Sequence, residues 1–191
     1  MMNQPADDMI SVAEARAAVL AGVKPLNAEQ VGVAECFGRV LAEDVASRLT
    51  QPPVAVSSMD GYAVRAEDVA TVPATLTLIG ESAAGGGFEG TLEAGQTVRI
   101  FTGAPLPDGA DGVVIQEDTV TDGGQITMRE SATPGRFVRP AGLDFSAGDT
   151  LLEAGKCLNS RDVALIAGMN VPWVTVARRP RVAILSTGNE L

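Results

Sequence analysis

Glycine and proline divide this sequence into short segments. The 191 residues include 21 glycines and 11 prolines, which are unevenly spread and follow no regular period. Both residues favour turns and interrupt helices and strands. The chain therefore has the composition of a protein with many turns, unlike collagen or a disordered segment. Its length is enough for one ordinary domain or two small ones, with a buried core.

Short apolar runs in the middle of the chain predict a β-rich region over residues 47–145. Glycine clusters and Asp-Gly pairs separate the runs and are typical of turns. Several short strands at this spacing suggest a small barrel or sandwich. The predicted strands cover residues 75–78, 98–100, 112–115 and 125–128.

The flanking segments contain two predicted helices. Ser11 and Glu14 form a capping-box pattern, which predicts a packing helix over residues 11–23. A second helix is predicted to begin at residue 159 or 160 and to end at 168, with Asp162 placed favourably for the helix dipole. Short strands are predicted at residues 31–33, 40–45 and 173–176.

A continuous apolar run, residues 181–185, lies near the end of the sequence. Such runs are typical of parallel strands that are buried on both faces. Parallel strands need crossover connections, so we expect a chain truncated at the first strand of a missing α/β domain. The alternative is a short natural protein whose last strand joins an existing sheet. Residues 186–190 follow as a polar loop, in the position where α/β sheets bind ligands.

Residue composition excludes several classes of site. The chain has no histidine, which excludes Ser-His-Asp and Cys-His catalysis and histidine-ligated zinc or haem. Its two cysteines, Cys36 and Cys157, are too few for a disulfide scaffold or a four-thiolate metal site. Because both lie among apolar residues, they are predicted to be reduced core thiols.

Charge and hydropathy limit the expected partners. A net charge of −10 argues against nucleic acid, since phosphate contacts need clustered lysine and arginine. No apolar run approaches the roughly 20 residues that span a membrane, and the acidic N-terminus lacks the features of a signal peptide. We therefore expect a soluble, cytoplasmic protein that binds neither nucleic acid nor membrane.

Two loops concentrate groups that could act chemically. Residues 57–63, Ser-Ser-Met-Asp-Gly-Tyr-Ala, follow a stiff Pro-Pro pair and combine two serines with Asp60 and the only tyrosine. An Asp-Gly pair alone is typical of a turn, so the functional interpretation depends on these neighbours. In the second loop, Thr102 and Gly103 follow a strand and could present a hydroxyl and a backbone N–H to an anion.

Two further segments carry charged side chains. Arg139 and Asp144 form either a surface ion pair or an arginine for an oxyanion beside a carboxylate for a hard cation such as Mg²⁺. In the loop after the last apolar run, small polar residues could receive a phosphate and Glu190 could hold a cation. Residues 85–90 match G-x-G-x-x-G, but a strand follows them instead of a helix, so we interpret them as a flexible loop.

Taken together, five motifs resemble the molybdopterin molybdenumtransferases, which include MoeA and the E-domain of gephyrin. They occur in order along almost the whole chain. They are G-R-V-L-A-E-D-V at residues 38–45, S-x-M-D-G-Y-A at 57–63, T-G-A-P-x-P-x-G-A-D at 102–111, R-x-x-G-x-D at 139–144 and P-x-V-x-x-x-S-T-G-N-E-L at 180–191.

The resemblance implies an activity in molybdenum cofactor biosynthesis. Such enzymes insert molybdenum from molybdate into adenylylated molybdopterin with Mg²⁺ and release AMP. The resemblance also implies a homodimer, whose cleft lies between the α/β domain of one subunit and the β-rich domain of the other. A molybdopterin adenylyltransferase is the implied upstream partner.

Carried onto this sequence, the resemblance predicts catalytic roles for Asp60, Thr102 and Asp144. It predicts substrate binding by Ser57, Ser58, Arg139, Thr187 and Gly188, and metal binding by Asp60, Asp144 and Glu190. Carboxylates repel molybdate, so the acidic residues would hold Mg²⁺ or position water. Arg139 and Thr102 would face an oxyanion or phosphate.

The resemblance also defines the expected fold, which is α+β and mostly β. Residues 1–46 and 146–178 would form a discontinuous N-terminal and linker domain, and residues 47–145 an inserted, barrel-like domain. Residues 179–191 would be the first strand and loop of a truncated molybdopterin-binding α/β domain. The helix at 11–23 would pack on that missing domain, and the fragment alone would be inactive.

Two non-catalytic alternatives stay open at this point. One is a dimerisation and scaffold module of the gephyrin E-domain type, and the other is a stand-alone acidic binding domain. A scaffold predicts an exposed apolar groove for a partner peptide, whereas the enzyme predicts that Asp60 and Asp144 converge on a cleft.

Overall fold

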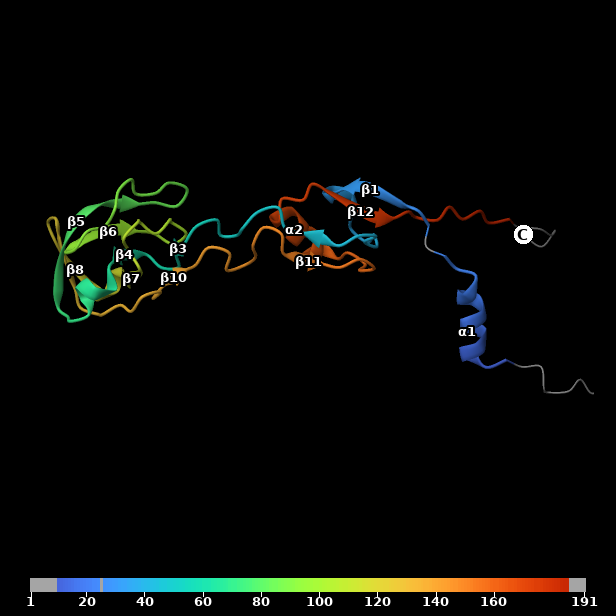
Figure 1. The fold of residues 1–191 in the computed structure, drawn as a ribbon, viewed down its shortest axis with the longest axis horizontal. Helices are drawn as coiled ribbons and strands as arrows, with labels where there is room; N and C mark the ends of the chain where they lie inside the picture. The colour runs from blue at the N-terminus through green and yellow to red at the C-terminus, as the bar shows by residue number, and fades with distance from the viewer. Residues whose placement is uncertain (1–9, 25, 186–191) are drawn as a thin grey trace, which may run out of the picture. The chain divides into compact units, whose positions relative to one another are not determined.

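The computed structural model describes residues 10–24 and 26–185, which fall into two compact units (Figure 1). The β-rich unit consists of Ala46–Leu151 and Gly168–Val171. The terminal unit consists of Met1–Val45, Leu152–Ala167 and Pro172–Leu191.

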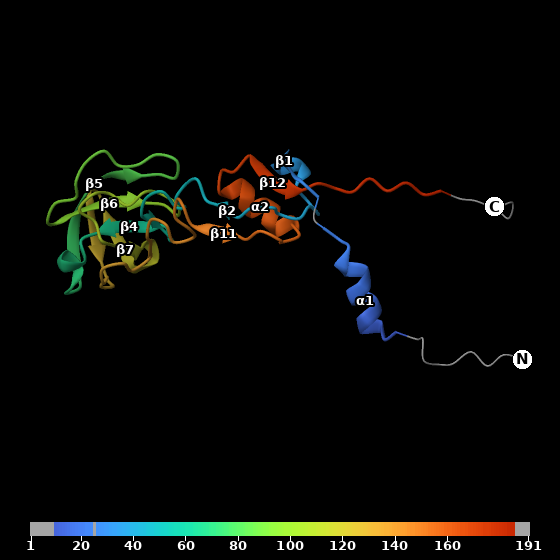
Figure 2. The same cartoon turned by 45° about the vertical axis from the view of Figure 1, so that its right-hand side comes forward.

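A six-stranded sheet forms the centre of the β-rich unit, and Figure 2 shows four of its strands, β5, β6, β4 and β7, side by side. The strand order is β7-β4-β6-β5-β9-β8. Only β5 and β6 run parallel, and the other neighbouring pairs are antiparallel. The strands are β4 (Gly61–Val64), β5 (Ala74–Ser82), β6 (Gln96–Ile100), β7 (Gly112–Ile115), β8 (Thr119–Asp122) and β9 (Gln125–Met128). Two shorter strands, β3 (Val56–Ser57) and β10 (Val138–Arg139), pair with each other, and η3 (Ala66–Val69) is a 3₁₀ helix after β4.

The central sheet is curled. The Tyr62 hydroxyl on β4 lies 3.2 Å from the Thr121 hydroxyl on β8, although β6, β5 and β9 separate these two strands in the sheet. In a flat sheet, four strand spacings would place them about 19 Å apart. Because strands outnumber helices in the described residues, the prediction of a mostly β fold is confirmed.

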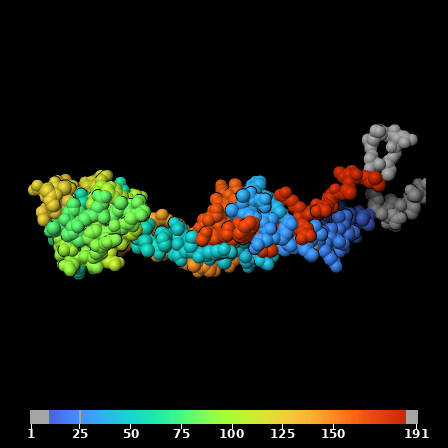
Figure 3. All heavy atoms as spheres, turned by 90° about the horizontal axis from the view of Figure 1, so that it is seen from above, coloured from blue at the N-terminus to red at the C-terminus, as the bar shows by residue number. Residues whose placement is uncertain are grey.

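Alternate residues of the sheet contribute to two apolar clusters. In β4, Tyr62 and Val64 belong to one cluster and Ala63 to the other, as the two-residue period of a strand requires. Figure 3 shows the atoms of this unit closely packed on the face that is seen. The first cluster also contains Val69, Leu76, Val114, Ile126, Met128 and Ala132, and the second contains Leu92, Val98, Ile100, Ala104 and Val113.

The four strands predicted between residues 75 and 128 are confirmed as β5, β6, β7 and β9, with β5 longer than predicted. One interpretation is corrected, because the segment Gly61–Ala63 belongs to β4 and is not a loop. A Cβ atom on Gly61 would lie 2.1 Å from the Val114 carbonyl oxygen and 2.9 Å from the Ile115 Cα atom. Glycine at this position therefore allows β4 and β7 to approach each other closely.

We predict that Gly61→Ala destabilises the β-rich unit by about 2 kcal/mol or more, because the added methyl group meets rigid backbone. Gly124→Ala is the matched control, since its Cβ would meet nothing within 4 Å. Urea unfolding of both variants measures the difference. Equal stability of the two variants would contradict the close approach at Gly61.

The terminal unit contains two helices and a two-stranded ladder. Its strands β1 (Ala28–Gly32) and β12 (Trp173–Ala177) pair antiparallel. Two further short strands, β2 (Val45–Ala46) and β11 (Thr150–Leu152), pair with each other, and each has residues in both units. The helices are α1 (Val12–Ala21) and α2 (Ser160–Gly168), and η2 (Val33–Glu35) is a 3₁₀ turn. Its buried side chains include Cys36, Leu41, Leu158, Ile166, Val174 and Val176.

The predicted start of α1 is confirmed, whereas its apolar residues are exposed. The Glu14 N–H donates to Ser11 Oγ over 3.2 Å, and Glu14 Oε2 accepts from the Ser11 N–H over 2.8 Å. No residue of α1 is buried; Val12 and Val19 are 86% and 71% exposed. Within the described residues α1 thus has no packing partner, and its packing on a further domain stays a prediction.

The strand at residues 181–185 is predicted as part of a further α/β domain and stays a prediction, whereas the alternative that it joins an existing sheet is not borne out. These residues form no strand, and Val182 and Ile184 are exposed. Burial on both faces needs neighbouring strands and covering helices, and the described residues supply neither to this segment. The loop predicted at residues 186–190 lies outside the described residues.

Two smaller predictions are also corrected. Val33 was expected in a strand but begins η2, immediately after β1. Cys36 is buried as predicted, and its thiol donates to the Val33 carbonyl over 3.0 Å. Cys157 is exposed, which corrects its prediction as a core thiol. It forms an isolated bridge with Val40, which is also exposed, so this bridge lies outside the core.

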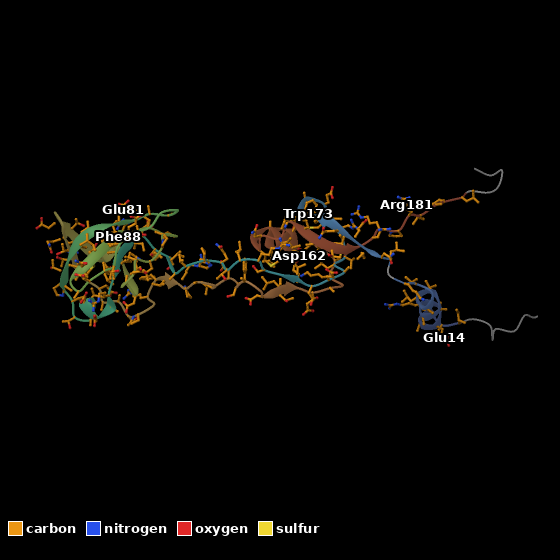
Figure 4. All side chains as sticks on the ribbon, turned by 45° about the horizontal axis from the view of Figure 1, so that its top comes forward. Glu14, Glu81, Phe88, Asp162, Trp173 and Arg181 are labelled. Atoms are coloured by element: carbon orange, nitrogen blue, oxygen red, sulfur yellow. The ribbon has the colours of Figure 1, made fainter. Side chains whose placement is uncertain are left out.

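The glycine-rich segment 85–90 leads into β6 through turns and contains no helix, which agrees with its interpretation as a loop. Phe88 holds this loop against β5 (Figure 4). Its ring occupies the space that a Cβ on Gly80 or Gly90 would need. Within residues 10–24 and 26–185, no helix is long and apolar enough to cross a membrane.

Asn159 and Asp162 cap α2 reciprocally. Asn159 Oδ1 accepts from the N–H groups of Arg161 and Asp162, over 2.8 Å and 3.1 Å, and Asp162 Oδ2 accepts from the Asn159 N–H over 2.9 Å. Asp162 Oδ1 also lies 2.9 Å from Lys156 Nζ. The Asn159 N–H and, less strongly, Lys156 lower the pKa of Asp162, although burial of this carboxylate opposes the shift.

We predict that Asp162→Ala lowers the stability of the terminal unit by about 1–2 kcal/mol at pH 7, the usual effect of losing such a cap. Because the pKa of Asp162 is lower in the folded state, its carboxylate stabilises the fold above the ordinary aspartate range near pH 4. This contribution is lost as the pH falls through the lowered pKa.

Urea unfolding of the wild type and Asp162→Ala at pH 7 and near pH 3 measures this effect. The difference in unfolding free energy should shrink at the lower pH. Glu153→Gln, an exposed acidic position nearby, is the control. A difference that is the same at both pH values would refute the role of the ionised cap.

Candidate functional site

The main functional candidates of the β-rich unit lie where three neighbouring strands meet at one edge of the sheet. β4 is antiparallel to β6 and β7, and Gly61 is opposite the last residue of each. The start of β4 therefore lies beside the ends of β6 and β7. Asp60 precedes β4, Thr102 follows β6, and Gln116 begins the 3₁₀ helix η4 (Gln116–Asp118) directly after β7.

Asp60 and Thr102 are in direct contact. Asp60 Oδ1 accepts a hydrogen bond from the Thr102 N–H and another from the Thr102 hydroxyl, each over 2.8 Å. These two donors, with a smaller contribution from the charge of Arg99, lower the pKa of Asp60. The structure thus places an ionised, exposed carboxylate beside a threonine, and both residues are candidates from the sequence analysis.

A glycine turn directs Thr102 towards Asp60. Gly103 has φ +82°, a left-handed conformation that glycine adopts without steric cost. Its N–H donates to the Ser57 carbonyl over 2.8 Å, and the Ser57 N–H donates to the Ala104 carbonyl over 2.9 Å. The segment after β6 is therefore fixed against β3, and it cannot swing freely away from Asp60.

Arg99 is a part of this site that the motif analysis missed. Its guanidinium carbon lies 5.0 Å from the ring centroids of both Tyr62 and Phe101. One nitrogen donates to the Gly61 carbonyl over 3.2 Å and the other to Gln116 Oε1 over 2.5 Å. A sequence signal exists, because Arg99 is the only charged residue of β6 and lies just before the Thr-Gly turn.

The hydroxyls of Ser57 and Ser58 both bond to the backbone. Ser57 is buried; its hydroxyl donates to the Met59 carbonyl over 2.6 Å and accepts from the Met59 N–H over 3.2 Å. The Ser58 hydroxyl donates to the Phe137 carbonyl over 3.0 Å. Both serines therefore hold the loop before Asp60 in shape, and their predicted contacts with substrate stay predictions.

Arg139 and Asp144 form an ion pair. One Arg139 nitrogen lies 2.9 Å from Asp144 Oδ1 and 3.2 Å from Oδ2, and both side chains are nearly half exposed. Arg139 is on β10, opposite Val56 of β3. Gly142, between the two, has φ +72° and turns the chain so that Asp144 can reach back. The two groups are close enough to act together, and whether they meet an oxyanion or a cation stays a prediction.

The predicted metal site is not completed by the described residues. Within residues 10–24 and 26–185, no group of three or more histidine, cysteine, aspartate or glutamate side chains could hold a metal ion. Glu190, Thr187 and Gly188 lie outside the described residues. The structure thus brings Asp60 to Thr102 and Arg139 to Asp144, and the convergence of Asp60 and Asp144 on one cleft stays a prediction.

The sequence matches a known family along most of its length. Residues 10–169 match the MoeA N-terminal region, domains I and II. The chain is 46% identical over 158 residues to a molybdopterin molybdenumtransferase of Nostoc sp., covering 81% of this chain and 36% of that protein. It is 36% identical over 185 residues to the molybdopterin molybdenumtransferase of Haemophilus influenzae, covering 96% and 46%. The chain therefore spans less than half the length of these relatives.

The fold has a close counterpart among solved structures. The crystal structure of the molybdopterin biosynthesis MoeA protein from Pyrococcus horikoshii OT3 superposes with a TM-score of 0.81 at 32% identity, covering 86% of this chain and 45% of that one. Sequence and fold agree, and the chain belongs to the MoeA family, within its N-terminal region.

Proposed function

We propose that the β-rich unit supplies catalytic and substrate-binding residues to a molybdopterin molybdenumtransferase. The reaction would insert molybdenum from molybdate into adenylylated molybdopterin and release AMP. Family membership supports this proposal, and one observation carries it at the level of residues. Asp60 holds an ionised carboxylate that receives both the N–H and the hydroxyl of Thr102.

The chemistry of Asp60 follows from its hydrogen bonds. A lowered pKa keeps the carboxylate charged at neutral pH, so it repels molybdate and attracts cations and water protons. Its role would be to orient water or a cation beside the oxyanion. Thr102 bonds to one carboxylate oxygen and fixes the plane in which the other is presented.

Arg139 would contribute the positive charge that an oxyanion or phosphate needs. Its partner Asp144 keeps the guanidinium oriented through two N–O contacts. Only one Arg139 nitrogen contacts Asp144, so the other N–H donors of the guanidinium could meet substrate while the ion pair is kept. Ser57, Ser58, Thr187 and Gly188 complete the proposed substrate-binding set.

Mg²⁺ stays a proposal that depends on Glu190. Two carboxylates of the described residues, Asp60 and Asp144, are suitable oxygen donors, but each already has a partner and no third carboxylate joins them within those residues. A cytoplasmic homodimer that receives its substrate from a molybdopterin adenylyltransferase is proposed on the family resemblance alone.

A scaffold role is the second candidate function. It is favoured by the exposed apolar residues of α1 and of the segment 181–185, among them Val12, Val19 and Ile184. Such residues are suited to an interface. The enzyme could also use such an interface. The scaffold role would therefore become the leading candidate only if the joined protein does not insert molybdenum.

We predict that Asp60→Asn lowers molybdenum insertion by about 10²-fold. Asparagine keeps an oxygen that can accept from Thr102 but loses the negative charge. Insertion is measured with molybdate, Mg²⁺ and adenylylated molybdopterin, using this chain alone and this chain joined to the remaining part of the Haemophilus influenzae relative. Asp122→Asn, at an exposed position of β8, is the control.

The two forms of the chain separate the two candidate functions. Insertion by the joined protein that depends on Asp60 would support the enzyme. Full insertion by the joined Asp60→Asn variant would remove Asp60 from the mechanism. No insertion by the joined wild-type protein, with a folded β-rich unit, would favour the scaffold.

A further inference from the structure

Arg99 connects all three segments that meet at the edge of the sheet. It extends from β6, contacts the Tyr62 ring of β4 and the Phe101 ring that follows β6, and donates to Gly61 of β4 and Gln116 of η4. Few side chains could make these contacts at once. A planar guanidinium can present its face to aromatic rings while its edge donates to two acceptors.

Three of the four contacts of Arg99 involve residues that are adjacent to Asp60 or Thr102 in sequence or through a hydrogen bond. Gly61 is the residue after Asp60, and Phe101 is the residue before Thr102. The Gln116 N–H donates to the Asp60 carbonyl over 3.2 Å. A change at Arg99 is therefore transmitted to both sides of the Asp60–Thr102 hydrogen bonds.

We propose that Arg99 is a positioning residue, which fixes the backbone around Asp60 and Thr102 so that the carboxylate is held in one orientation. The inference deepens the proposed function, on which its effect on catalysis rests. Its effect on the pair itself does not depend on any substrate. Arg99 acts through Asp60 and Thr102, and no contact between Arg99 and substrate is needed.

The charge of Arg99 also acts on Asp60. A guanidinium near a carboxylate favours the ionised form, and this adds to the two hydrogen bonds from Thr102. The other ionisable groups around Arg99 are Glu81, its register partner on β5, Glu117 on η4, which accepts from the Gln116 side chain, and the Tyr62 hydroxyl on β4. Arg99 is therefore the only cation among these groups.

Two substitutions separate the geometry of Arg99 from its charge. Arg99→Met keeps an unbranched chain over the rings but removes the charge and both donors. Arg99→Lys keeps the charge but cannot donate to Gly61 and Gln116 in the same fork. Arg136→Met is the matched control, since Arg136 also lies over a ring, at 5.1 Å from the Phe137 centroid, and pairs with Glu130.

The first test follows the pair by NMR in this chain without substrate. Carboxyl carbon titration reports the pKa of Asp60, and amide hydrogen exchange reports the Thr102 hydrogen bond. In Arg99→Met the pKa of Asp60 should rise towards the ordinary aspartate value, and exchange at Thr102 should become at least tenfold faster. Arg99→Lys should show the faster exchange and a smaller rise in the pKa of Asp60 than Arg99→Met, because it keeps the charge but loses the fork of donors, and Arg136→Met should change neither.

The second test measures insertion by the same variants in the joined protein. Arg99→Met should lower kcat by about tenfold or more with a smaller change in KM, because displaced groups react more slowly. A folded Arg99→Met variant with the wild-type pKa of Asp60 and wild-type exchange at Thr102 would overturn the proposal. If Asp60→Asn leaves insertion unchanged while the NMR changes appear, the proposed function fails and the positioning role of Arg99 stands.

Discussion

The close approach of β7 to Gly61 is the constraint on which the edge of the sheet depends. A side chain at this position would overlap the Val114 carbonyl, so only glycine lets β4 lie directly between β6 and β7. This arrangement brings the residue before β4 beside the residues that follow the other two strands. The Asp-Gly pair therefore combines a candidate functional carboxylate with the glycine that makes its location possible.

Much of the polar chemistry in the motifs maintains local backbone shape. The Ser57 hydroxyl closes a turn on Met59, the Ser58 hydroxyl bonds to the Phe137 carbonyl, and Gly103 turns the chain after β6. These contacts leave few degrees of freedom to the segments that carry Asp60 and Thr102. A reactive group held in this way loses little conformational entropy when a substrate binds.

Local patterns were predictable from the sequence, whereas long-range contacts were not. The capping box at Ser11 and the positions of β6, β7 and β9 follow from periodicity and from turn residues within a few positions. The contact of Asp60 with Thr102 joins residues 42 apart and depends on strand register, so the motifs indicated its members but not its hydrogen bonds. Arg99 was missed because a polar residue between two apolar residues is typical of an ordinary alternating strand. The strand at 181–185 stays a prediction, because its pattern indicates burial against neighbours that the described residues do not supply.

The two candidate carboxylates differ in how their charge is balanced. Asp144 lies against the positive charge of Arg139, and the two opposite charges balance each other. Asp60 receives its two bonds from the neutral donors of Thr102, which stabilise the ionised form without cancelling its charge. Only one nitrogen of Arg139 contacts Asp144, so the guanidinium keeps further N–H donors that an anion could use. Within the proposed function, this difference favours cation and water chemistry at Asp60 and anion binding at Arg139.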